Sequence, residues 1–153
     1  MPNSVENSRE ATILAETLGP ALLQLVRQFR AGIHAAGLSP SQAMVLKRLH
    51  EHPGLGVGEL AAAERLRRPT ISSHIKELEA AGLVERLPPH ADDRRRVGFK
   101  ITPAGRVLLE TVKARWTEWL AHRLDELPAP GRRALADALP HLGAMSAHTE
   151  PTP

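Results

Sequence analysis

The chain has no cysteine, and its 153 residues include only four aromatic side chains, two Trp and two Phe. Without cysteine it forms no disulfide, holds no metal through a thiolate and uses no thiol as a nucleophile or redox sensor. Single-stranded nucleic acid is bound by stacking bases on exposed aromatic rings, which four rings hardly supply. The sequence also lacks a signal peptide and an apolar run of about 18 residues that would span a membrane. We therefore expect a cytoplasmic protein with no membrane partner.

The composition is that of a globular protein with a single core. Hydrophobic residues make up 42% of the chain and charged residues 24%, which argues against global disorder. The polar ends, residues 1–9 and 148–153, are expected to be flexible.

Positive charge is concentrated in the middle of the chain. The formal charge is only +3. Residues 1–64 and 107–153 each carry five Lys and Arg against six Asp and Glu, whereas residues 65–106 carry ten against five. A local excess of this kind is typical of proteins that bind the phosphate backbone, although a solvated basic face would look the same.

Apolar periodicity predicts a mainly α-helical protein with one β-hairpin. Helices are expected at 10–36, 40–52, 57–64, 68–81, 103–127 and 131–147, and strands at 83–87 and 96–101. Gly19-Pro20 predicts either a kink in the first helix or a separate turn before a helix that begins at Pro20. In the second strand, Val97, Phe99 and Ile101 are expected to face inward.

Two short helices joined by a tight turn form a helix-turn-helix candidate. Ser39-Pro40-Ser41-Gln42 predicts a capping box at the start of the preceding helix, which buries Ala43, Val45, Leu46 and Leu49. In helix 68–81, Ile71, Ile75 and Leu78 share the core face, and His74 lies at its flank. The same wheel turns five side chains outward: Pro69, Thr70, Ser72, Ser73 and Lys76.

The order of elements is that of a winged helix-turn-helix, in which a helix enters the major groove and a hairpin reaches the flanking backbone or minor groove. The sequence resembles the MarR (multiple antibiotic resistance regulator) family of bacterial transcription factors. The resemblance rests on Leu38-Ser39-Pro40-Ser41-Gln42, Leu60-Ala61, Arg68-Pro69-Thr70-Ile71-Ser72, Leu78-Glu79-Ala80-Ala81-Gly82-Leu83-Val84, Asp93-Arg94-Arg95 and Ile101-Thr102-Pro103-Ala104-Gly105.

This resemblance implies a homodimer that binds a palindromic operator in duplex DNA. The implied organisation is a flexible N-terminus (1–9), a dimerisation helix (10–36), a winged DNA-binding domain (38–102), dimerisation helices (103–147) and a flexible tail (148–153). By the resemblance, Arg95 enters the minor groove and Asp93 orients it. The chain departs from the family pattern at three places: Arg65 replaces a Gly in the turn, Arg67 replaces a capping Ser, and Ser73 often corresponds to a basic residue.

We therefore predict a transcriptional regulator, expected to be a repressor, and not an enzyme, since no catalytic constellation is present. No cofactor or metal site is expected; His50-Glu51-His52 lacks the spacing of a helical metal pair. The predicted DNA-binding residues are Arg67, Arg68, Pro69, Thr70, Ser72, Ser73, His74, Lys76, Asp93, Arg94, Arg95 and Arg96. The alternative is a winged-helix adaptor that binds an acidic protein partner through the same basic face.

A small aromatic or anionic effector is also expected, because in the family effectors often bind between the dimerisation helices and the winged domain. The candidate residues, chosen by helix position, are Phe29, Arg30, Ile33, His34, Met44, Lys47 and Trp116. For each of them, ordinary packing is the competing interpretation.

Overall fold

The computed structural model describes residues 3–88 and 97–147. Within these ranges it contains six helices and one two-stranded antiparallel sheet, so the expected mainly helical winged fold is confirmed. The chain divides into two compact units, residues 1–114 and residues 115–153, and each is described by itself.

The first helix is longer than the sequence predicted. α1 (Asn3–Ala35) begins seven residues before the expected start at residue 10, and it continues through Pro20 without a separate turn. Residues 3–18 contain no glycine or proline, so no residue in this stretch breaks the helix. Pro20 leaves one backbone hydrogen bond unmade. After α1 the chain turns at Gly37, whose φ is +79°.

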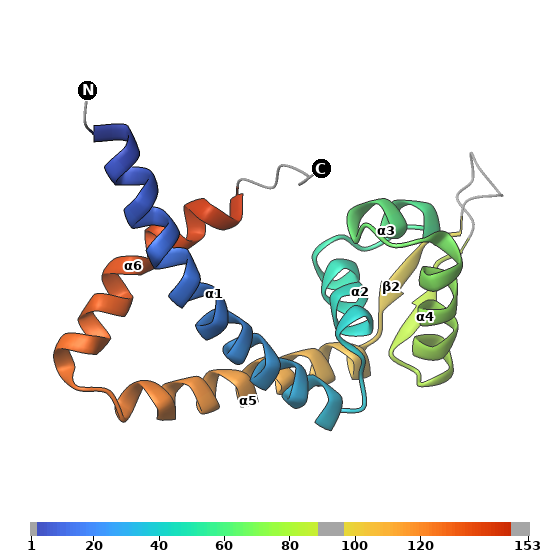
Figure 1. Ribbon diagram of the computed structural model, residues 1–153. Coiled ribbons are helices and arrows are strands. Elements are labelled where there is room, and N and C mark those ends of the chain that lie inside the picture. The colour runs from blue at the N-terminus through green and yellow to red at the C-terminus, as the bar shows by residue number, and fades with distance from the viewer. Residues whose placement is uncertain (1–2, 89–96, 148–153) are drawn as a thin grey trace. The chain divides into compact units, whose positions relative to one another are not determined.

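The winged domain is built around a core that the predicted helices share. α2 (Pro40–Glu51), α3 (Val57–Ala63) and α4 (Arg68–Ala80) pack together with the sheet (Figure 1). The expected core residues of α2 and α4 are buried, and Leu60 of α3 and Ile33 of α1 join them. The capping box of α2 is also confirmed, since Ser39 Oγ accepts from the Gln42 N–H and Gln42 Oε1 accepts from the Ser39 N–H.

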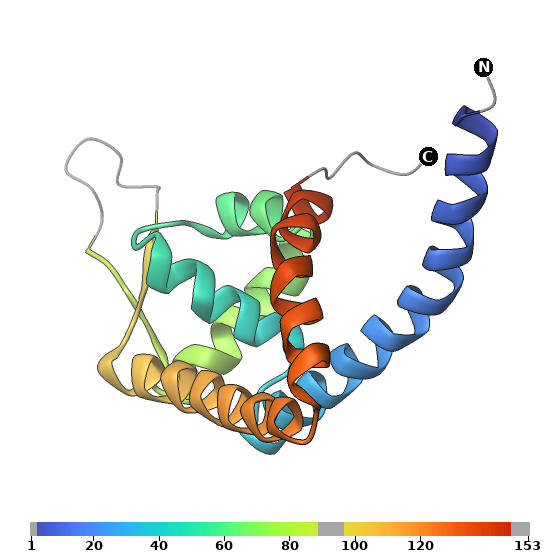
Figure 2. The same cartoon turned by 90° about the vertical axis from the view of Figure 1, so that its left-hand side faces the viewer.

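The sheet is short and is joined to the end of α2. β1 (Val84–Arg86) pairs with β2 (Phe99–Ile101), between the end of α4 and the start of α5 (Pro103–Asp125) (Figure 2). On its other edge, Phe99 exchanges backbone hydrogen bonds with the loop after α2: its carbonyl accepts from the Gly54 N–H, and its N–H donates to Leu55. β2 therefore has a partner on both sides.

Both strands begin later than predicted, β1 also ends one residue earlier, and Val97 is not in the core. Phe99 and Ile101 are buried as expected, but Val97 is 37% exposed. The reason is that Val97 precedes the strand, and Gly98 lies so close to the Gly54 backbone that a Cβ there would come within 2.6 Å of the Gly54 carbonyl oxygen. The alternation of a strand does not extend to Val97.

The start of α5 shows what Thr102 and Gly105 of the segment Ile101-Thr102-Pro103-Ala104-Gly105 do in the fold. Thr102 Oγ1 donates to the Gly82 carbonyl and accepts from the Gly105 N–H, so it joins the turn after α4 to the first turn of α5. Gly105 packs directly against the Leu83 carbonyl, where a Cβ would clash. Val112 completes the contact of α5 with the core of this unit.

The second unit contains the rest of α5 and α6 (Ala129–Ala147). Trp116 and Trp119 stack on α5 with ring centroids 4.8 Å apart, and the Arg123 guanidinium lies over the Trp119 ring. Along α6, Leu135, Leu139 and Met145 are exposed. Over the described part of the chain, no helix has the length and apolar character needed to cross a membrane.

Candidate nucleic-acid interface

The outward face of α4 has the composition that the helical wheel predicted. Thr70, Ser73 and Lys76 are exposed and Ser72 is half-buried, opposite the buried core face of the same helix. Pro69 occupies the first turn, where its missing N–H costs no hydrogen bond. The small hydroxyl side chains would let a groove edge approach the helix closely.

His74 lies at the flank of the core face, as expected. Its side chain is 17% exposed, and its Nδ1 atom is buried without a hydrogen-bond partner. The nearest carboxylate oxygen is Glu77 Oε2, at 4.0 Å. His74 is therefore much less accessible to DNA than its neighbours on α4.

The turn before α4 has the backbone conformation that usually requires glycine. Arg65 has a φ of +52°, the left-handed conformation. The Leu66 N–H donates to the Ala61 carbonyl and the Arg65 N–H to the Ala62 carbonyl, which is the Schellman pattern of a helix end. Arg65 thus occupies the position that glycine normally fills, and its exposed side chain adds a cation beside α4.

Arg67 is the N-cap of α4 and does not cap it through its side chain. Its backbone is extended, with a φ of −72° and a ψ of 144°, and no side-chain hydrogen bond closes the first turn. The N–H groups of this turn therefore keep their hydrogen-bonding capacity, next to the positive end of the helix dipole. This end of α4 favours an anion, and phosphate is the anion that duplex DNA presents.

Some cations near α4 are neutralised within the fold. Arg48 Nε donates to Glu64 Oε1 at 2.9 Å, Arg86 donates to both oxygens of Glu79 at 2.7 and 3.1 Å, and Lys100 pairs with Glu85 across the sheet at 2.9 Å. The pKa values of Arg48 and Arg86 are raised, because Glu64 and Glu79 stabilise the protonated guanidinium groups. The larger effect is the hydrogen bond to the carboxylate, and the smaller one is the negative charge of the carboxylate. These pairs hold elements together.

Other cations have no acidic partner among residues 3–88 and 97–147. They flank the outward face of α4, two before it, one in its first turn and one near its middle: Arg65, Arg67, Arg68 and Lys76. Only such unpaired cations can neutralise phosphate without first breaking an internal ion pair. These four cations of the middle segment are therefore available on this face.

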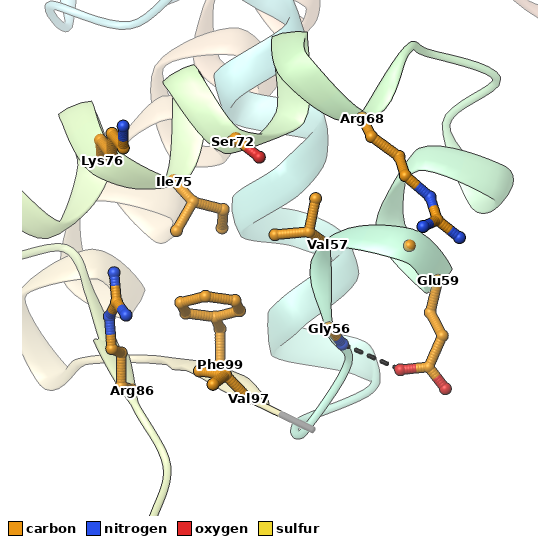
Figure 3. Close-up of a pocket in the computed structure, with 11 residues that line it drawn as sticks. Gly56, Val57, Glu59, Arg68, Ser72, Ile75, Lys76, Arg86, Val97 and Phe99 are labelled. Carbon is orange, nitrogen blue, oxygen red and sulfur yellow. Dashed lines mark hydrogen bonds between the residues drawn. The ribbon is translucent and has the colours of Figure 1, made fainter. Parts of the chain in front are cut away.

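An open hollow of about 710 Å³ borders α4 on the side of the sheet. In Figure 3, Arg68 and Lys76 stand at its two ends, and Ile75 and Phe99 form an apolar wall between them. The Arg86 guanidinium lies over the Phe99 ring, 5.7 Å from its centroid. Glu59 points away from this wall and accepts from the Gly56 N–H at 2.9 Å, which caps α3.

One residue of this face was not predicted from the sequence. Glu77 is exposed, one turn after Ser73, and it accepts hydrogen bonds from Ser73 Oγ at 2.9 Å and from Gln42 Nε2 at 2.6 Å. The spacing of four between Ser73 and Glu77 was the available signal, because such pairs are neighbours on a helix. The contact with Gln42 joins residues far apart in the sequence and had no such signal.

The predicted wing residues Asp93, Arg94, Arg95 and Arg96 lie outside the described residues. The structure describes the chain to Pro88, after β1, and again from Val97, before β2. Their contact with DNA stays a prediction.

The predicted effector residues are divided between the two units, and their role in effector binding stays a prediction. Trp116 belongs to the second unit, and the other six belong to the first. Ile33 is 3% exposed and is part of the core, whereas Phe29 and Met44 are 37% and 46% exposed. Lys47 pairs with Glu51 at 3.6 Å. The hollow beside α4 contains none of the seven.

Comparison with known proteins gives a consistent result. The family model described as MarR family matches residues 38–97. A helix-turn-helix-type transcriptional regulator of Mycobacterium tuberculosis is 34% identical over 125 residues, which cover 82% of this chain and 87% of the relative. A helix-turn-helix-type transcriptional repressor of the same species, Rv2887, is 29% identical over 114 residues, covering 74% of this chain and 81% of the repressor.

The fold is also similar to that of solved structures. A mutant of MepR from S. aureus, bound to an oligodeoxyribonucleotide, matches with a TM-score of 0.70 and 20% sequence identity, covering 86% of this chain and 96% of that chain. At this identity the likeness establishes the fold.

Proposed function

Because the chain belongs to the MarR family of transcriptional regulators, whose members bind DNA and are not enzymes, we propose that it represses transcription by binding a palindromic operator as a homodimer. The observation that carries this proposal is the group of four cations that flank the outward face of α4 and have no acidic partner among the described residues. That face combines charge for the phosphates with small hydroxyl side chains for the base edges.

The proposed complex places α4 of each protomer in a major groove. Thr70 and Ser73 then face base edges, while Arg67, Arg68 and Lys76 contact the phosphates on either side. In a two-fold symmetric dimer the two recognition helices enter grooves one helical turn apart, about 34–36 Å. Arg95, oriented by Asp93, enters the flanking minor groove in this proposal, with Arg94 and Arg96 beside it.

The proposed dimer would cover apolar side chains that α1 leaves exposed. These side chains lie along the helix from its third turn onward: Ile13, Leu14, Leu22, Leu23, Leu25, Val26 and Phe29. Several exposed apolar side chains on one helix are typical of a protein–protein interface. Light scattering at micromolar concentration should give twice the chain mass, and a mass near 16.7 kDa would contradict the dimer.

The proposal includes release of the DNA by a small aromatic or anionic effector. The exposed side chains of Phe29 and Met44 supply apolar surface, and Arg30 supplies a cation near the end of α1. If an effector acts, a small anionic phenol added to the protein–DNA complex should release the DNA, and it should do so only by preferring the unbound conformation.

Fluorescence anisotropy with duplex DNA from the chain's own promoter, at two salt concentrations, tests the central claim. Binding should be sequence-dependent and should weaken steeply with salt. No binding at either salt concentration would favour the adaptor that binds an acidic protein. Arg95→Ala should weaken all duplexes and reduce the salt slope by roughly 1. A variant that matched the wild type at every salt concentration would contradict the wing assignment.

A further inference from the structure

Glu77 is an unexpected residue on a face proposed to meet DNA. A carboxylate there repels phosphate, so its presence needs a physical reason. Glu77 receives two hydrogen bonds, one from Ser73 at the centre of the outward face and one from Gln42 at the start of α2. His74 Nδ1 lies 4.0 Å from the same oxygen that Gln42 contacts.

The direction of each hydrogen bond in this cluster follows from chemistry. The Ser39 N–H can only donate, so the Gln42 oxygen faces Ser39 and the Gln42 amide nitrogen faces Glu77. An ionised carboxylate can only accept, so the Ser73 hydroxyl must give its one proton to Glu77. With that proton committed, the Ser73 oxygen retains only lone pairs.

We propose that Glu77 is a positioning residue that makes the Ser73 hydroxyl an obligate acceptor, so that Ser73 selects a base carrying an exocyclic amine. In the major groove, cytosine offers its N4 amine and adenine its N6 amine, whereas guanine and thymine offer acceptor oxygens at the corresponding edges. A free serine hydroxyl could donate to either of the latter. This inference rests on the proposed entry of α4 into the major groove.

Gln42 gives the cluster its rigidity. Its amide is held on one side by the capping box of α2 and on the other by Glu77, and it therefore fixes the carboxylate relative to a second helix. Hydrogen bonds to a charged acceptor are stronger than those between neutral groups. Rotation of the Ser73 hydroxyl away from Glu77 thus requires the loss of a strong bond.

The first experiment measures base preference with a library of randomised duplexes. The wild-type protein defines the preferred sequence, and Ser73→Ala identifies the position that Ser73 contacts. At that position the wild type should prefer cytosine or adenine over guanine and thymine by roughly two- to tenfold, the range of one hydrogen bond. Glu77→Ala should abolish this preference at that position and nowhere else. Glu51→Ala removes the same charge from α2 and should leave the preference unchanged.

The double variant separates two roles for Glu77. If Glu77 acts through Ser73, Glu77→Ala combined with Ser73→Ala gives the same preference as Ser73→Ala alone. If Glu77 instead contacts a base itself, the two losses add, and the proposal is wrong.

Exchange of the residues at positions 42 and 77 gives the sharpest test. Gln42→Glu keeps the capping box, which accepts Glu or Gln at this position, but places a second carboxylate against Glu77. It should therefore remove the base preference. In the double variant with Glu77→Gln, the new amide nitrogen at position 77 donates to the new carboxylate at position 42. The amide oxygen at position 77 still accepts from the Ser73 hydroxyl, so the base preference should return. Equal melting temperatures of these variants would show that the cluster does not act through folding.

The outcomes distinguish this inference from the proposed function. Loss of all salt-dependent duplex binding in the wild type would refute the function itself. Normal binding with an unchanged preference in Glu77→Ala, or no recovery in the exchanged pair, would refute only the role of Glu77.

Discussion

The left-handed backbone of Arg65 predicts that one substitution, Arg65→Gly, changes the stability of the fold and the affinity for DNA in opposite directions. In Arg65→Gly the Schellman end of α3 keeps both of its backbone hydrogen bonds, but the Cβ that opposes a φ of +52° is removed. A residue with a Cβ costs about 1–2 kcal/mol in this conformation. The greater freedom of glycine in the unfolded chain takes back about 0.5–1 kcal/mol.

The net expectation is a free energy of unfolding higher by about 0.5–1 kcal/mol. For a chain of this length that raises the melting temperature by about 1–4 °C. Arg65→Ala is the matched control, because it removes the same charge beside Arg67 and Arg68 but keeps the Cβ. Urea titration or calorimetry of both variants therefore isolates the backbone contribution.

In DNA binding the two variants should behave alike. Each variant loses one unpaired cation. The dependence of log affinity on log salt should therefore become shallower, and the magnitude of its negative slope should fall by roughly 1. If Arg65→Gly were no more stable than Arg65→Ala, the argument from backbone strain would be refuted. If neither variant changed the salt slope, Arg65 would not contact phosphate.

Three further predictions concern the same unit. Arg68→Ala and Lys76→Ala should each reduce the salt slope by roughly 1 in anisotropy titrations without changing base preference, whereas a changed preference would assign them to bases. Gly105→Ala should lower the free energy of unfolding by about 1–3 kcal/mol in urea titration, since a methyl group would press on the Leu83 carbonyl, and an unchanged midpoint would refute that packing. Glu79→Gln should increase DNA affinity at low salt by releasing Arg86 from its ion pair, and gel shifts that match the wild type would show that Arg86 stays away from the phosphates.

The parts of the fold that depend on local chemistry were predictable from the sequence. The capping box at Ser39 and the buried stripe of α4 follow from spacing alone, and both were confirmed. The predicted start of α1 at residue 10 was wrong because no Gly or Pro in residues 3–9 breaks the helix, which begins at Asn3. The position of Val97 was wrong because the close approach of Gly98 to Gly54 brings together residues distant in the sequence.

The candidate site was predictable as a surface but not as a set of contacts. The wheel placed Ser73 and Lys76 outward, since orientation follows from the helical repeat. Which cations are unpaired depends on side-chain conformations, as with Arg86 and Glu79, and these have no signature in a single sequence. The same holds for the contact between Gln42 and Glu77.

The second hydrogen-bonded edge of β2 has a mechanical consequence. Because Phe99 exchanges hydrogen bonds with the loop that ends α2, the base of the hairpin is fastened to α2 as well as to its own partner strand. A rotation of α2 would therefore move β2 in the same direction. The position of β2 relative to α2 is thus set at the loop containing Gly54 and Leu55, neither of which is among the residues proposed to contact DNA.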